Sequence, residues 1–178
     1  FEERYETRFK EIIAPAIESI EIKGESLKPY RVDLSKTGDS ILTDIIDGIA
    51  HSQFFLADVS SIGKDSVTGK SYRNGNVMYE VGIALACRQS TEILIVRDDR
   101  EKFLFDISTI PHMTVDFTKK ETAKMILREE ILSRLKEHNY FKNARVSMIL
   151  SSLTDEEVSL LHYMGSITLR EATRSKGL

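Results

Sequence analysis

The sequence predicts an α/β protein in which a parallel β-sheet is covered by helices on both faces. Short apolar runs, such as Phe54–Val59 and Glu92–Val96, alternate with longer segments whose apolar residues recur at helical spacing. The two runs are continuously apolar at their centres, which is typical of strands buried on both faces of a parallel sheet. Strands that alternate with helices favour parallel pairing through right-handed crossovers.

The first half of the chain begins with an amphipathic helix, expected over residues 3–22 and bent by Pro15. A short strand is expected over Pro29–Asp33. The next helix should be capped near Gly38–Ser40, and its apolar stripe, from Ile41 to Ile49, should face the core. The run Phe54–Val59 follows as a buried strand.

The second half of this pattern begins with residues 60–75, which are polar and contain glycines and therefore indicate a long loop. A helix is expected over residues 77–89, followed by the strand Glu92–Val96. Met113–Phe117 alternates as an edge strand does, and residues 119–138 have the pattern of a charged amphipathic helix. Because the chain opens directly into helical sequence at Phe1, the first and normally central strand of such a sheet is expected to be absent from it.

The pattern changes after Tyr140, so we expect an α/β domain over residues 1–140 and a helical extension over 141–178. Residues 141–152 are expected to be a connector. Thr154 and Glu157 then form the T-x-x-E pattern of a capping box in front of a short apolar helix.

The composition narrows the function classes. The 178 residues are 41% hydrophobic and 30% charged, with a net charge of −3, so no general attraction to nucleic acid or anionic membranes is expected. No apolar run approaches the ~20 residues of a membrane span. The single cysteine, Cys87, excludes an internal disulfide and is expected to pack in the core, which suits a reducing, cytoplasmic compartment.

Ligands of open α/β sheets bind beyond the carboxyl ends of the strands. Asp33, Asp58 and Ser60 are expected at this edge, together with the start of the helix 77–89. The next strand is followed by Arg97, Asp98 and Asp99. We expect these residues to form a solvated turn; the alternative is that they contact a diphosphate or a partner.

Glu80 is the strongest candidate for chemistry. It is the only charged residue between Arg73 and Arg88, on a helix otherwise made of small and apolar residues. With Asn76 as the helix cap, Glu80 lies at the edge of the first turn. It is then either a glutamate favoured by the helix dipole or a carboxylate held in a cleft, ionised, as a nucleophile or as a stabiliser of an oxocarbenium-like sugar.

The other candidates each have a structural alternative. Asp58 either accepts hydrogen bonds from loop amides or binds a ribose hydroxyl. Asn74 and Asn76 either cap the helix or contact the substrate. Gly82 either allows close packing of the helix on the sheet or leaves room for a ligand beside Glu80.

Two sequence patterns that could suggest a binding site do not predict one. The segment Gly63–Ser71 has five residues between its glycines where a phosphate-binding P-loop has four. The four histidines have no spacing typical of metal ligands, so no metal site is expected.

Three segments in this order, SILTDIIDGIAHSQFFLADVS, NGNVMYEVGIALA and EILIVRDD, resemble those of nucleoside 2-deoxyribosyltransferase-like proteins, which are relatives of bacterial TIR-type domains. The resemblance covers roughly residues 3–117 and implies a three-layer, flavodoxin-like fold. It places Glu80 at the catalytic glutamate, Asp58 at the acid that closes the preceding strand and Gly82 among the small residues that follow the glutamate.

The resemblance implies an enzyme that cleaves the N-glycosidic bond of a nucleotide or nucleoside, or that transfers its sugar. NAD is one possible substrate, and no cofactor is implied. A non-catalytic nucleotide-binding, sensing or self-assembly module is the alternative, and homo-oligomers are expected because TIR-type relatives often act as oligomers.

Overall fold

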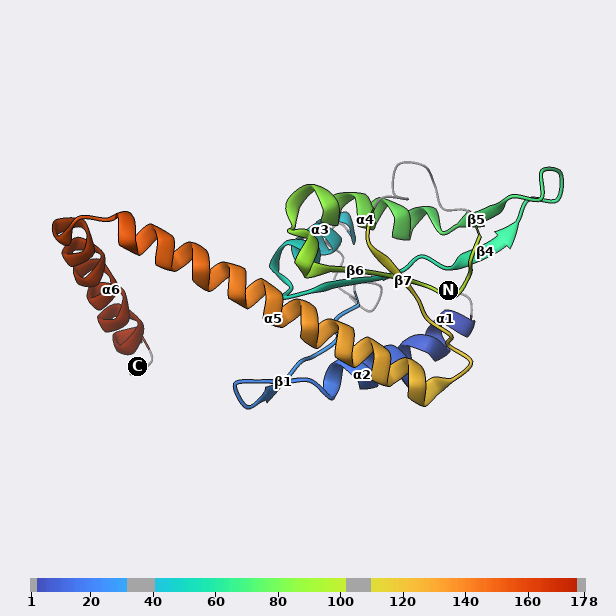
Figure 1. The fold of residues 1–178 in the computed structure, drawn as a ribbon, viewed down its shortest axis with the longest axis horizontal. Helices are drawn as coiled ribbons and strands as arrows, with labels where there is room; N and C mark the ends of the chain where they lie inside the picture. The colour runs from blue at the N-terminus through green and yellow to red at the C-terminus, as the bar shows by residue number, and fades with distance from the viewer. Residues whose placement is uncertain (1–2, 32–40, 102–109, 176–178) are drawn as a thin grey trace. The chain divides into compact units, whose positions relative to one another are not determined.

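The computed structural model describes residues 3–31, 41–101 and 110–175, which form two compact units (Figure 1). The units are Phe1–Glu137 and His138–Leu178. The unit that contains the strands comes first along the chain and the helical unit second. The division lies between Glu137 and His138, close to the boundary that the sequence suggested after Tyr140. The first unit contains the strands and the candidate site.

The N-terminal helix consists of three consecutive pieces: α1 (Glu3–Arg8), the π-helical turn η1 (Phe9–Ile13) and α2 (Ala14–Glu18). The N–H of Ala14 donates to the carbonyl oxygen of Phe9, five residues back, instead of four. Pro15, which has no N–H and whose ring crowds the preceding turn, explains why the helix widens here. The bend expected at Pro15 is thus taken up by a π turn.

The helix ends at Glu18, earlier than the sequence predicted, because a small hairpin follows. Its strands are β1 (Glu21–Ile22) and β2 (Glu25–Ser26), and its turn residues Lys23 and Gly24 have φ angles of 52° and 85°. Positive φ at both turn positions matches the twist of a tight hairpin. The predicted helix had extended through Ile22, over the residues that form β1.

The central sheet has three parallel strands in the order β3-β6-β7, which confirms the predicted parallel α/β architecture. β3 (Phe55–Asp58) and β7 (His112–Thr114) flank β6 (Ile93–Arg97), all five residues of which are buried. The strand predicted at Pro29–Asp33 is wrong for Pro29–Arg31, which lie outside any strand, while Asp33 falls outside the described residues. Proline has no N–H for a ladder, and Arg31 instead pairs with Glu6 at 2.8 Å.

Alternate side chains of β6 enter two different clusters. Leu94 and Val96 pack with the N-terminal helices and α5 (Lys120–Ser152), whose buried residues are Ala123, Leu127, Ile131 and Leu135. Ile93 and Ile95 pack with α3 (Ile41–His51) and α4 (Gly75–Cys87). In Figure 1, α1 and α2 lie on one side of these strands and α3 and α4 on the other.

Two expectations about these helices are wrong. In the apolar stripe of α3, Ile49 is buried, but Leu42 and Ile46 are each 44% exposed. Cys87 is exposed, not packed in the core, because it lies at the last turn of α4, beyond the buried residues Val81 and Ala84.

A β-hairpin over residues 61–73 occupies most of the segment 60–75, where the sequence predicted a long loop. β4 (Ser61–Lys64) pairs with β5 (Ser71–Arg73) in antiparallel fashion. The turn is closed by Asp65, whose Oδ1 accepts hydrogen bonds from the N–H and hydroxyl of Thr68 at 2.6 and 2.7 Å. These hydrogen bonds lower the pKa of Asp65. The segment Gly63–Ser71 is thus the tip of a β-hairpin and not a loop that leads into a helix, as a phosphate loop does.

The expected connector over 141–152 is wrong, because α5 continues to Ser152 and α6 (Asp155–Ser175) begins soon afterwards. The predicted capping box is confirmed. The N–H of Thr154 donates to Glu157 at 2.8 Å, and the N–H of Glu157 donates to the Thr154 hydroxyl at 3.3 Å. None of the helices in the described part of the chain is long and apolar enough to cross a membrane.

Candidate functional site

Two carboxylates at the carboxyl ends of neighbouring strands share one arginine. Asp58 ends β3, Asp98 follows β6, and the parallel register of these strands places both at the same edge of the sheet. Arg8, the last residue of α1, donates from Nη1 to Asp58 at 3.0 Å and from Nη2 to Asp98. The side chains of Arg8 and Asp58 are only 13% and 11% exposed. Burial by itself would lower the pKa of Arg8, but the charge and hydrogen bonds of Asp58 and Asp98 outweigh it and raise that pKa.

Ser60 connects the members of this group. Its side chain is buried, and its hydroxyl donates to Oδ1 of Asp58 at 2.5 Å. The Oγ of Ser60 accepts from Nη1 of Arg8 at 3.1 Å and from the backbone N–H of Asp98 at 2.9 Å. The Ser60 N–H also donates to Asp58 at 3.0 Å. Asp58 and Ser60, both predicted as site residues, are thus brought together, and Asp58 is held by three donor groups.

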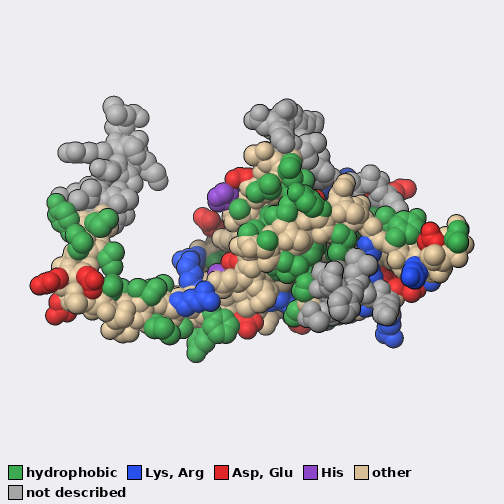
Figure 2. All heavy atoms as spheres, turned by 90° about the horizontal axis from the view of Figure 1, so that it is seen from above, with side chains coloured by type: hydrophobic (Ala, Val, Ile, Leu, Met, Phe, Trp, Pro, Cys, Tyr) green, Lys and Arg blue, Asp and Glu red, His purple; other side chains and the backbone are tan. Residues whose placement is uncertain are grey.

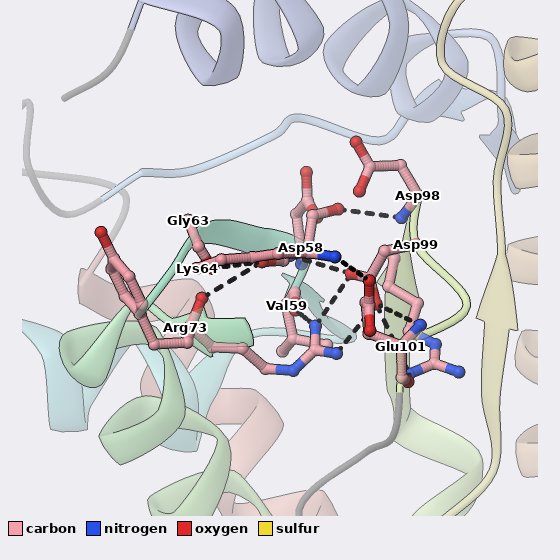
Figure 3. Close-up of polar contacts among 12 residues, drawn as sticks. Asp58, Val59, Gly63, Lys64, Arg73, Asp98, Asp99 and Glu101 are labelled. Atoms are coloured by element: carbon pink, nitrogen blue, oxygen red, sulfur yellow. Dashed lines mark hydrogen bonds and ion pairs between the residues drawn. The ribbon is translucent and has the colours of Figure 1, made fainter. Parts of the chain in front are cut away.

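A second arginine, Arg73, joins the hairpin β4–β5 to the same edge of the sheet (Figure 3). Arg73, at the end of β5, forms a two-pronged ion pair with Asp99 at 3.0 and 3.1 Å and also donates to the carbonyl of Val59. Asp99 accepts further hydrogen bonds from the N–H groups of Ser61 and Glu101. Burial raises the pKa of Asp99, but these donors outweigh it and lower that pKa overall.

The favoured expectation of a solvated turn at residues 97–99 is therefore wrong. Arg97 is buried and donates to the carbonyl of Glu101, while Asp98 and Asp99 pair with Arg8 and Arg73. The signal for this cluster in the sequence was the three consecutive charged residues Arg97, Asp98 and Asp99, which come directly after an apolar run. Their partners Arg8 and Arg73 could not be identified, because one lies about ninety residues away and the other was assigned to a loop.

A cavity of about 750 Å³ adjoins this cluster. Its apolar lining includes Ile12, Val115 and Phe117, and its charged lining includes Arg8, Asp98 and Asp116. The guanidinium of Arg8 lies 4.5 Å from the centre of the Phe117 ring. Hydrogen bonds from the hydroxyl and N–H of Thr118 lower the pKa of Asp116, so its carboxylate stays ionised. Arg4, Arg100 and Lys120 also line the cavity, so apolar residues and charged groups of both signs face it. Such a lining suits a planar ring that carries polar substituents.

The structure changes the position of Glu80 in its helix. The cap of α4 is Asn74, not Asn76: its side-chain oxygen accepts from the N–H of Asn76 at 2.9 Å and from that of Val77 at 3.4 Å. Glu80 therefore lies six residues after the cap, in the second turn, where the helix dipole has little effect. The explanation of Glu80 as a first-turn glutamate is accordingly wrong. Asn74 was expected either to cap the helix or to contact the substrate, and in the structure it caps the helix.

Glu80 is half-buried, directly before the fully buried Val81. It does not line the cavity as far as the described residues define that cavity. Gly82 is exposed, and no described atom lies within 4 Å of where its Cβ would be, so close packing does not explain this glycine. Asn76 is exposed as well.

Asp33, the remaining predicted site residue, lies outside the described residues. Among the residues that are described, no three His, Cys, Asp or Glu side chains are grouped so that they could hold a metal ion.

No protein-family model matches the chain. A comparison with curated proteins gives no significant match either.

Proposed function

We propose that the carboxyl edge of β3, β6 and β7 binds a nucleoside or nucleotide, with NAD as one candidate. The supporting observation is the cavity beside the Arg8–Asp58–Asp98 cluster, at the edge where parallel sheets bind ligands. In this proposal the base lies against the apolar lining, and a carboxylate of the cluster accepts a hydrogen bond from a sugar hydroxyl. Asp58 acts as a positioning residue, because Arg8 and Ser60 already fix its two oxygens.

We further propose that the protein cleaves the N-glycosidic bond of this ligand, or transfers its sugar, with Glu80 as the reacting carboxylate. The base would leave first, Glu80 would capture or stabilise the ribosyl cation, and water or an acceptor would then attack C1′. This role requires the sugar to extend out of the described cavity toward α4. The half-buried position of Glu80 at the margin of the packed face of α4 supports a carboxylate that is partly shielded from water.

With this function we propose a three-layer, flavodoxin-like fold related to that of nucleoside 2-deoxyribosyltransferases and TIR-type domains. We further propose that the protein acts in the cytoplasm. Three parallel strands, with separate apolar clusters on alternate side chains of β6, support it.

A non-catalytic nucleotide-binding or sensing module is the second candidate. Two observations favour it: Glu80 is not among the described residues that line the cavity, and the carboxylates of Asp58 and Asp98 are both already paired with Arg8.

Incubation with NAD and with deoxynucleosides, followed by detection of free base, separates the two candidates. We expect free base with the natural chain and none with Glu80→Gln at unchanged thermal stability. Glu121→Gln, at an 85% exposed position on α5, is the matched control and should keep full activity. Wild-type activity of Glu80→Gln would remove Glu80 from the mechanism. Binding by calorimetry without free base would favour the sensor, and neither binding nor product would overturn both candidates.

A further inference from the structure

The C-terminal unit presents its apolar residues to solvent. Between Asn139 and Gly165, every residue except Leu153 is exposed. Six large apolar side chains in this stretch are between 56% and 71% exposed: Tyr140, Met148, Ile149, Leu160, Tyr163 and Met164. Hydrophobic side chains are visible along both helices of the unit in Figure 2. Helices in proteins owe most of their stability to the packing of an apolar face, yet between residues 139 and 165 no residue of either helix is buried.

Part of this set shares a helix face. At about 100° per residue, Tyr140 and Met148 lie within about 80° of each other on α5, and Leu160 and Met164 lie within about 40° of each other on α6, whereas Ile149 is on the side of α5 opposite Tyr140. By contrast, the first part of α5 buries Leu127, Ile131 and Leu135 in the core of the α/β unit. The apolar residues after Leu135 therefore serve a different contact from those before it.

The charges on the two helices indicate what covers the surface. The segment His138–Ser152 carries Lys142 and Arg145 and no acid, whereas the start of α6 carries Asp155, Glu156 and Glu157. Arg170, Glu171 and Arg174 follow in the second half of α6, away from the turn between α5 and α6. At about 1.5 Å per residue, Lys142 lies roughly 15 Å from the end of α5 at Ser152. The acids lie just beyond that end, at the start of α6. The basic and acidic groups are therefore at opposite ends of the α5 segment.

We propose that α6 and the last part of α5 pack against the same helices of a second copy of this chain, in an antiparallel, two-fold arrangement. A two-fold axis places the turn of one copy beside the other end of its partner. The cations at 142 and 145 then lie beside the acids at 155–157 of the second copy, twice in each dimer. A parallel arrangement would place like charges together, so the charge pattern selects the antiparallel one. This surface is separate from the proposed catalytic site.

Sedimentation velocity of the full chain tests the proposal, over about 1 to 100 μM, where dimers with micromolar Kd dissociate. We expect the mass of two chains at the upper end of this range. Variant A, Lys142→Glu with Arg145→Glu, and variant B, Asp155→Lys with Glu156→Lys, should each raise the dimer Kd about tenfold or more. Glu157 is kept in both variants because it caps α6. Lys136→Glu, on the same helix but within the α/β unit, is the matched control and should leave Kd unchanged.

A one-to-one mixture of variants A and B decides the result. Both faces of a mixed dimer regain opposite charges, so we expect the mixture to dimerise with nearly the Kd of the natural chain. Circular dichroism of each variant should show unchanged helix content, which separates lost association from lost folding. A natural chain that stays monomeric throughout the range would overturn the proposal, as would a mixture that associates no better than its components. Either result leaves the proposed catalytic function unaffected, because that function is tested by base release.

Discussion

Arg8→Met removes the guanidinium that joins the carboxylates at the ends of β3 and β6. Breaking a buried ion pair by removal of one partner costs about 3–5 kcal/mol, whereas an exposed pair contributes under about 1 kcal/mol. Arg8 and Asp58 are 13% and 11% exposed, and Asp98 is 25% exposed. Asp58 keeps its hydrogen bonds from Ser60. We therefore expect a loss of about 2–3 kcal/mol in the free energy of unfolding at pH 7.

Urea unfolding at pH 7, followed by circular dichroism, gives this free energy. A loss of 2–3 kcal/mol corresponds to roughly 4–12 °C in melting temperature for a chain of this size. Lys10→Met is the control, because Lys10 pairs with Glu6 from a side chain that is 68% exposed. It should cost under about 0.5 kcal/mol. An Arg8→Met variant no less stable than this control would refute the ion-pair account of the edge.

Three further predictions concern stability and are checked by the same urea titrations. Asn74→Ala removes the cap of α4 and should cost about 1 kcal/mol. Leu127→Ala, at a fully buried position, should cost about 2–5 kcal/mol, whereas Met125→Ala, 54% exposed on the same helix, should cost under about 0.5 kcal/mol. Asp99→Asn should be less stable than the natural chain at pH 7 and approach it as the pH falls below ~4, because the depressed pKa of Asp99 stabilises only its ionised form.

Much of the fold could be predicted because its determinants are local. The fully apolar run of β6 identified the central strand, and the capping box at Thr154 and Glu157 identified the start of α6. The N-terminal π turn follows from Pro15, whose effect on a helix is local as well. Its exact form was not predictable, since Pro15 could also have been accommodated by a smooth bend.

The elements that were missed depend on residues distant in sequence. The hairpin β4–β5 has a polar sequence typical of a loop, and it is fixed at its base by Arg73, which pairs with Asp99 twenty-six residues away. Arg8 is one of many charged residues on the first helix, and its partners are fifty and ninety residues away. Sequence placed Asp58 and Ser60 at the correct edge because they end a strand, but it could not identify the arginine that organises them.

The most direct test of the central claim, that this edge of the sheet binds a nucleoside or nucleotide, is a methyl NMR titration of the full chain. Ile12 and Val115 line the cavity, whereas Ile49 belongs to the cluster with α3 and α4. On addition of NAD or a deoxynucleoside, we expect the methyl signals of Ile12 and Val115 to shift and saturate, while those of Ile49 move little. Saturable shifts confined to Ile49 and its neighbours, or no shifts with either ligand, would contradict the claim.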